Sequence, residues 1–232
     1  MTRALLTLLF TATFVLSPLA TEPFSGYRAD QLPIPQVDPP AQPAGYAFAI
    51  WGLIYGWLVV SALFGAWKRA EDPAWDVARP ALIAALALGT PWLWVANRSA
   101  EWATVLIFAM AAAAILALMR APGPDRGWLR APVAIFAGWL TAASFVSLAA
   151  TAAGHGLIAG ATGWAYLAIA GAGLVAALVQ LRRPDSPEYG ATVIWALAGI
   201  IAANGTALWP VTAVAALAAL ILAAIALRPR PA

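Results

Sequence analysis

The chain has 232 residues, of which 63% are hydrophobic and only 10% are charged. A soluble domain usually carries about 25% charged residues because water must solvate its surface, so this composition excludes an ordinary soluble protein. The formal net charge is +3, and the absence of cysteine excludes disulfides, thiolate nucleophiles and cysteine-bound metals.

The apolar segments are long and do not alternate with polar residues, as in ALIAALALG and AVAALAALILAAIAL. Barrel strands in membranes are short and alternate, whereas a helix satisfies its own backbone hydrogen bonds in lipid. We therefore predict an all-α membrane protein, a polytopic bundle of transmembrane helices. A span needs about 20 apolar residues, and we expect eight spans, near residues 4–20, 46–67, 80–97, 102–119, 131–151, 157–181, 190–204 and 208–227.

The basic residues support this count. With a cytoplasmic N-terminus, the cytoplasmic segments contain Arg3, Lys68, Arg69, Arg79, Arg120, Arg126, Arg130, Arg182, Arg183, Arg228 and Arg230. The opposite side contains only Arg28 and Arg98. Positive charge is retained on the cytoplasmic side, so we predict an integral protein of the bacterial inner membrane with both termini in the cytoplasm.

The first apolar segment, residues 1–20, has a second interpretation. Its basic start, apolar stretch and small residues before Thr21 are also typical of a cleaved signal peptide. Cleavage would leave seven spans in the same orientation, so the sequence leaves both alternatives open.

Residues 21–45 form the one long external connection, and six of them are prolines. Proline-rich chain is extended and semi-rigid, and long loops are often functional. The segment is therefore either a lid across the mouth of the bundle or a plain linker.

Tryptophan is unusually frequent, with 12 residues. Trp67, Trp75, Trp102, Trp128 and Trp209 lie at predicted span ends or in loops, where indole rings favour the membrane interface. These five are predicted to form an interfacial belt.

Other aromatic residues lie deeper in the predicted spans. Phe48, Trp51 and Tyr55 are spaced to share one face of the second span, and Trp139 lies in the middle of the fifth. Such rings could line a pocket for a flat apolar ligand. Ordinary packing between helices explains the same spacing, and periodicity alone favours packing.

Smaller and polar residues accompany these rings. Ala143 and Ser147 follow on the Trp139 side of the fifth span, four and eight residues later. Trp92 and Trp94 lie near the external end of the third span, with Asn97 three residues after Trp94.

Catalysis has little support. No span interior clearly contains an ionisable residue, which is the usual mark of a functional site in a membrane. The only histidine, His155, lies in a short external turn, and zinc-protease, serine-hydrolase and phosphate-loop motifs are absent. We expect no catalytic residue, no metal, no resident cofactor and no nucleic-acid partner.

The stretch PAGYAFAIWGLIYGWLVV resembles the second-helix signature of the tryptophan-rich sensory protein family (TspO/MBR), relatives of the translocator protein or peripheral benzodiazepine receptor. The positions that match are Pro43, Tyr46, Phe48, Trp51 and Tyr55, after a proline pair at Pro39 and Pro40. Trp139 and Ala143 match the fifth helix, where Ser147 replaces the asparagine of that family. The third-helix pattern is not reproduced; PWLWVANRSAEW stands there instead.

The resemblance implies a five-helix region over residues 1–152 and three additional transmembrane helices over residues 153–232. The segment WALAGIIAAN is similar to the C-terminal part of longer members of the family. The sequence leaves a homodimer open.

Family members bind tetrapyrroles such as protoporphyrin IX. The resemblance thus implies a membrane sensor or binding protein for a flat hydrophobic ligand beneath the first loop. Transport of a small hydrophobic substrate is the alternative, and porphyrin degradation is a minor one. The predicted ligand-binding residues are Tyr46, Phe48, Trp51, Tyr55, Trp92, Trp94, Asn97, Trp139, Ala143, Ser144 and Ser147.

Overall fold

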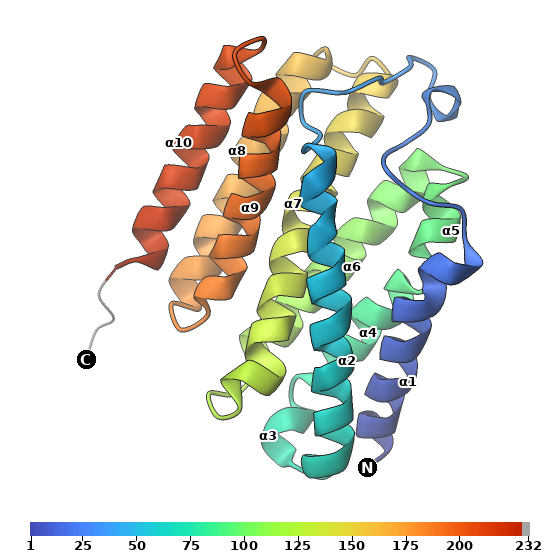
Figure 1. The fold of residues 1–232 in the computed structure, drawn as a ribbon, viewed down its shortest axis with the longest axis vertical. Coiled ribbons are helices and arrows are strands. Elements are labelled where there is room, and N and C mark those ends of the chain that lie inside the picture. The colour runs from blue at the N-terminus through green and yellow to red at the C-terminus, as the bar shows by residue number, and fades with distance from the viewer. Residues whose placement is uncertain (229–232) are drawn as a thin grey trace.

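The computed structural model describes residues 1–228, and over that range it consists of helices without a β-strand. The long helices run side by side in one bundle (Figure 1), which confirms the predicted all-α polytopic fold. The α-helices are α1 (Thr2–Leu16), α2 (Ile50–Lys68), α3 (Pro73–Asp76), α4 (Arg79–Gly89), α5 (Trp92–Ala96), α6 (Ala100–Arg120), α7 (Ala131–Gly154), α8 (Ala161–Arg182), α9 (Pro187–Asn204) and α10 (Trp209–Ala226).

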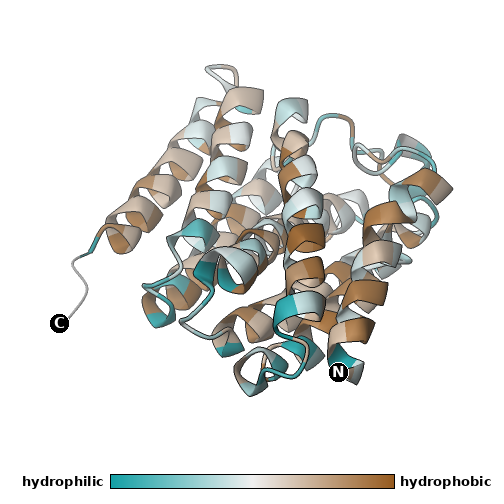
Figure 2. Ribbon diagram, turned by 60° about the horizontal axis from the view of Figure 1, so that its bottom comes forward, coloured by the Kyte–Doolittle hydropathy of each residue, from teal (hydrophilic) through white to brown (hydrophobic). Residues whose placement is uncertain are grey.

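Seven helical segments within residues 1–228 are long and apolar enough to cross a membrane. Helix α9, in the place of the predicted seventh span, is not among them, because Glu188 and Asn204 make both of its ends polar. It nevertheless packs between its neighbours α8 and α10 and against α7. Hydrophilic residues gather in the loops and at helix ends, while the helices are largely hydrophobic (Figure 2).

Helix α7 is the centre of the bundle and packs against α2, α6, α8 and α9. It is buried on nearly all sides, as expected for a helix that is apolar all round. Its many small residues allow neighbouring helices to approach closely. A β-carbon at Gly138 would lie only 2.6 Å from the carbonyl oxygen of Tyr189 in α9, so glycine permits that contact.

The predicted third span, residues 80–97, is broken into α4 and α5. Pro91 explains the break, because its ring cannot donate to the helix ladder and obstructs the preceding turn. Thr90 stabilises the junction: its hydroxyl donates to the Leu86 carbonyl at 3.0 Å and is 2.9 Å from the Thr13 hydroxyl of α1. The break turns α5 so that Trp92 faces the interior.

Residues 21–45 cross the end of the bundle between α1 and α2, beside α5 and the C-terminal end of α7 (Figure 1). Short helical turns occur in this part of the chain and at the other end of the bundle. They are η1 (Ser17–Ala20), η2 (Ala29–Gln31), η3 (Gly45–Ala49), which leads into α2, and a π-helical turn η4 (Arg126–Arg130), which leads into α7.

Candidate functional site

A cavity of about 280 Å³ lies beneath residues 21–45. Helices α1, α2, α6, α7 and α9 and the α4–α5 junction all contribute to its walls, and the proline-rich loop closes it from above. Its volume is close to the lower limit of about 300 Å³ for small-molecule pockets, and its lining is mostly apolar, as in such pockets.

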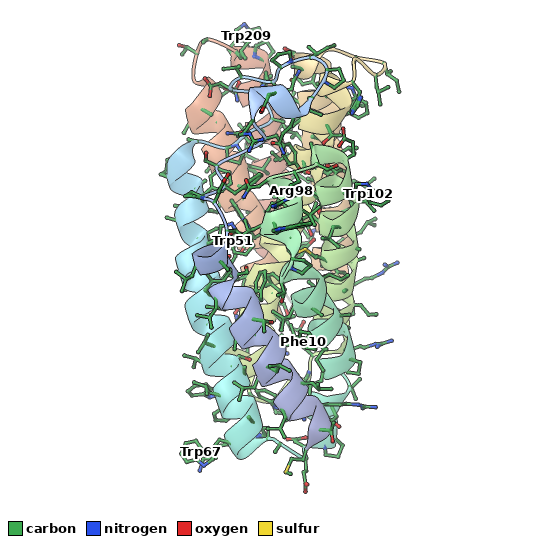
Figure 3. All side chains as sticks on the ribbon, turned by 90° about the vertical axis from the view of Figure 1, so that its right-hand side faces the viewer. Phe10, Trp51, Trp67, Arg98, Trp102 and Trp209 are labelled. Carbon is green, nitrogen blue, oxygen red and sulfur yellow. The ribbon has the colours of Figure 1, made fainter. Side chains whose placement is uncertain are left out.

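Aromatic rings from the second and fifth predicted spans converge on this cavity. The rings of Phe48 and Trp139 meet edge to face with centroids 5.7 Å apart, and those of Trp51 and Trp139 at 6.2 Å. Trp51 also stacks on Tyr55 at 5.2 Å, and Phe14 of α1 contacts Tyr55 at 5.4 Å. Spacing on one helix could not establish this convergence, which depends on how α2 and α7 pack. Figure 3 labels Trp51 beside the upper end of α1, between the two ends of the bundle.

Three donors on this aromatic wall have no hydrogen-bond partner within residues 1–228. They are the indole N–H groups of Trp51 and Trp139 and the hydroxyl of Tyr55. All three residues line the cavity, and their donors are not among the fully buried polar atoms without a partner, so they are open to the cavity. Trp139 is only 3% exposed. By contrast, the indole of Trp92 donates to the Ala103 carbonyl at 3.0 Å. Because these donors face the cavity, the wall offers hydrogen bonds to a molecule that presents acceptors.

The loop is held to the helices by a polar cluster around Tyr27. Its hydroxyl is hydrogen-bonded to Ser147 of α7 and lies 3.5 Å from Thr104 of α6. Thr104 in turn bonds Ser147 at 2.7 Å and Thr151 at 2.8 Å. Burial raises the pKa of the Tyr27 phenol above its ordinary value, although the hydrogen bonds to Ser147 and Thr104 lower it, so the hydroxyl is neutral at physiological pH.

Two further contacts fix the first half of the loop. Gln31 donates from its side-chain amide to the Ala96 carbonyl at 2.8 Å, and Asn97 donates to the Glu22 carbonyl at 3.1 Å. Phe24 packs edge to face on Trp92, with centroids 5.1 Å apart. The segment therefore lies over the cavity as a packed strap.

Seven of the predicted site residues line the cavity: Phe48, Trp51, Tyr55, Trp92, Trp139, Ala143 and Ser147. The other four lie outside its lining. Tyr46 packs on Trp195, Trp94 is 53% exposed with Arg98 over its ring, and Asn97 contacts the loop. Ser144 is buried and donates to carbonyls in α6 and α7. Ligand binding by all eleven stays a prediction.

Sequence reasoning did not select several residues that line the cavity. They include Phe14, Phe24, Tyr27, Gly89, Met110, Leu140 and Ala196. Phe14 lies in an apolar segment with an ordinary span composition, so no local signal separates it from lipid-facing neighbours. The loop aromatics Phe24 and Tyr27 could have been found, because two aromatic residues in a proline-rich external segment suggest that the segment packs inward.

The described residues contain no group of three or more histidine, aspartate or glutamate side chains placed to share a metal ion. Glu22 is the one charged side chain at the cavity lining, and it is 80% exposed. The walls therefore offer mainly aromatic and aliphatic surface with a few hydrogen-bonding groups.

The family model described as TSPO-like protein matches residues 3–228. This match extends across all the long helices, the last three included. No curated protein and no solved structure matches the chain. Because the family model covers nearly the whole length, the chain belongs to the TSPO-like protein family.

Proposed function

We propose that this TSPO-like membrane protein is a sensor that binds a flat, mostly apolar ligand of the tetrapyrrole class in the cavity beneath residues 21–45. The observation that carries the proposal is the convergence of Phe48, Trp51, Tyr55 and Trp139 on one cavity. Flat aromatic walls stack on a conjugated ring, and the three unpaired donors suit its ring nitrogens or carboxylates.

The size of the cavity adds a condition. A tetrapyrrole is larger than most small-molecule ligands, so a cavity of about 280 Å³ accepts it only if the loop shifts outward. The loop is held by individual hydrogen bonds around Tyr27, Gln31 and Asn97, each worth about 1 kcal/mol. The free energy of ligand binding is sufficient to break such contacts. Displacement of the loop would then be the conformational change by which the sensor reports the ligand.

Titration of the purified protein with protoporphyrin IX tests the proposal. We expect saturable quenching of tryptophan fluorescence together with a shift of the porphyrin absorbance. A variant carrying Trp51→Ala and Trp139→Ala lacks two of the aromatic rings of the cavity and should bind protoporphyrin IX at least about tenfold more weakly. The matched control carries Trp67→Ala and Trp209→Ala, two exposed indoles at opposite ends of the bundle (Figure 3). Undiminished affinity in the first variant would refute this site.

The proposal includes no chemical step. We propose that the ligand leaves unchanged, because the walls supply aromatic surface and single donors and no paired acid and base. The bound porphyrin should keep its absorbance under light and oxygen over many binding cycles. Loss of absorbance that depends on the protein would instead indicate degradation.

We place the loop end of the bundle outside the bacterial inner membrane and both termini in the cytoplasm, from the distribution of basic residues. The chain has no cysteine, so single cysteines can report the orientation. Val37→Cys is in the loop and Glu71→Cys is at the other end of the bundle, and both positions are exposed. A membrane-impermeant maleimide added to spheroplasts should label only Val37→Cys.

A further inference from the structure

Helix α9, far along the chain from the aromatic wall, also reaches the cavity. Its residue Ala196 lines the cavity beside Ala142 of α7, although Ala196 is only 1% exposed to solvent. We infer that α9 is part of the ligand site: it positions residues 39–48, which comprise the end of the loop and most of η3, and its Ala196 sets how deep the cavity is. The inference rests on the proposed function and assigns α9 a role that the five-helix resemblance does not contain.

The first step is that α9 holds the backbone of residues 39–48. Asn204 donates from its side-chain amide to the Pro40 carbonyl at 2.9 Å. The backbone N–H of Ala44 donates to the Gly199 carbonyl at 3.0 Å. The first bond comes from a side-chain amide of α9 and the second goes to a backbone carbonyl of α9. Together they fix where the backbone of residues 39–48 lies at the mouth of the bundle.

Trp195 forms a third attachment, one helical turn before Gly199. Its indole N–H donates to the Ala47 carbonyl at 3.0 Å, and its ring packs edge to face on Tyr46 at 5.6 Å. The Tyr46 hydroxyl donates to the Ala198 carbonyl at 3.4 Å. This explains why Tyr46, although it belongs to the predicted motif, points away from the cavity: it anchors η3 to α9.

Gly199 makes this close approach possible. A β-carbon there would lie 2.8 Å from Cβ of Pro43 and 2.9 Å from Cβ of Ala47, which is too close for both to stay in place. Pro43 itself lines the cavity, and so do Pro39, Gln42 and Phe48. Residues 39–48, which α9 holds, thus form one wall of the cavity. This segment ends at Phe48, whose ring contacts Trp139.

The second step concerns the depth of the cavity. Ala142, Val146 and Ala196 line the main cavity and also border a smaller void of about 10 Å³ between α7, α8 and α9. The side chains that line this void are wholly apolar. Three small aliphatic side chains therefore separate the two spaces, and the ligand edge that faces α9 must be hydrocarbon, such as the alkyl-substituted rim of a macrocycle.

Hydrogen exchange in the ligand-free protein tests the positioning role without any ligand. The variant Trp195→Phe with Asn204→Leu removes two attachments and keeps side chains of similar size. We expect amides in residues 39–48 to exchange about tenfold faster, with no change in residues 21–31, which other helices hold. The control Trp209→Phe alters an exposed indole of α10 and should change neither segment. Unchanged exchange in residues 39–48 of the double variant would overturn the positioning role.

The depth role is tested by protoporphyrin IX affinity in Ala196→Val and Ala196→Phe. Added volume at a packed wall should weaken binding progressively, to about tenfold or more for phenylalanine. Ala202→Phe makes the same change on an exposed face of α9 and should bind like the wild type. If Ala196→Phe does not fold, Ala196→Val alone decides the point.

The outcomes separate the two proposals. Wild-type affinity in both Ala196 variants, while Trp51→Ala with Trp139→Ala binds weakly, overturns the depth role and leaves the proposed function standing. A wild-type protein that does not bind protoporphyrin IX refutes the proposed function, and the exchange measurement then decides the positioning role of α9 by itself.

Discussion

The polar groups at the two ends of the bundle have different surroundings. At the end formed by α3, η4 and the α8–α9 turn, which we call the basic end, arginine side chains are extensively paired. Arg183 donates to the carbonyls of Leu118, Met119 and Ala121 and pairs with Asp185. At the loop end, the donors of Trp51, Trp139 and Tyr55 face the cavity and bond no group within residues 1–228.

This difference indicates where function lies. The two buried polar atoms that lack a partner within residues 1–228, Arg130 Nε and Glu188 Oε2, lie at the basic end, so incomplete pairing alone does not mark a site. The donors at the loop end differ because they face a cavity, where a ligand can accept their hydrogen bonds. The comparison therefore predicts that substitutions at the basic end reduce stability and that substitutions in the cavity reduce binding.

The largest effect is expected for Arg79→Ala at the basic end. Arg79 is 2% exposed, pairs with Asp76, and donates to the carbonyls of Gly65, Arg69 and Ala70. Its removal leaves these acceptors unpaired and should cost about 3 kcal/mol of unfolding free energy. Thermal unfolding in detergent measures the loss. The porphyrin affinity of the folded fraction should stay within about twofold of the wild type, and a large affinity loss would contradict the separation of the two ends.

A matched pair of tyrosines tests the comparison more sharply. The Tyr189 hydroxyl is fully buried and lies 2.9 Å from the Thr141 hydroxyl, whereas the Tyr55 hydroxyl faces the cavity without a partner. Tyr189→Phe should lower stability by about 1 kcal/mol and leave affinity unchanged. Tyr55→Phe should leave stability unchanged and weaken porphyrin binding by about fivefold. If the two variants behave alike, the unpaired donor at the cavity has no role in binding.

The sequence predicted the bundle and one side of the site because both follow from local patterns. Hydrophobic length defines spans, and Phe48, Trp51 and Tyr55 fall on one helical face whatever surrounds them. Trp139 could be named from its position in the middle of a span. The break at Pro91 was also readable, since a proline there interrupts the helix ladder, yet the predicted span ran through it.

Residues contributed by other parts of the chain could not be predicted in the same way. Ala196 and Phe14 line the cavity only because α9 and α1 pack where they do, and nothing in their neighbourhood distinguishes them from other span residues. Tyr46 shows the reverse case. Its motif position suggested a cavity wall, but the helix begins as a 3-10 turn that directs its ring toward Trp195.

A smaller effect is expected for Tyr27→Phe, which loosens the loop but keeps the aromatic ring in the cavity lining. The variant loses the hydroxyl contacts to Ser147 and Thr104, so the loop should open more readily. Protoporphyrin IX should dissociate about fivefold faster, with little change in thermal stability. Stopped-flow dilution measures the rate. Val37→Ala, in the same loop, is the control, since that side chain is 74% exposed and does not line the cavity.

The Tyr27 contacts also have a defined pH dependence. The raised pKa means that the phenol stays protonated to higher pH in the folded than in the unfolded chain. Because burial is the cause of the raised pKa, the stability of the closed loop with a neutral phenol is complete below the ordinary tyrosine pKa and is lost as pH rises through the folded-state value. Wild type and Tyr27→Phe should differ in dissociation rate at pH 7 and converge only in strongly alkaline solution. Convergence at neutral pH would show that the hydroxyl contacts do not hold the loop.

The smallest effect is expected for Asp125→Asn at the basic end. Asp125 accepts from Arg69 at 2.7 Å and from the Trp75 indole at 3.1 Å. It has φ of 59°, a left-handed conformation that asparagine also tolerates, so the substitution removes charge without adding backbone strain.

The hydrogen bond from Arg69 lowers the pKa of Asp125. The stabilisation is therefore present above the ordinary carboxyl pKa and is lost as pH falls through the lower folded-state value. We expect Tm to fall by about 2 °C at pH 7, and the gap from the wild type to close in acid. A gap that persists at the lowest pH would assign the effect to packing instead of charge.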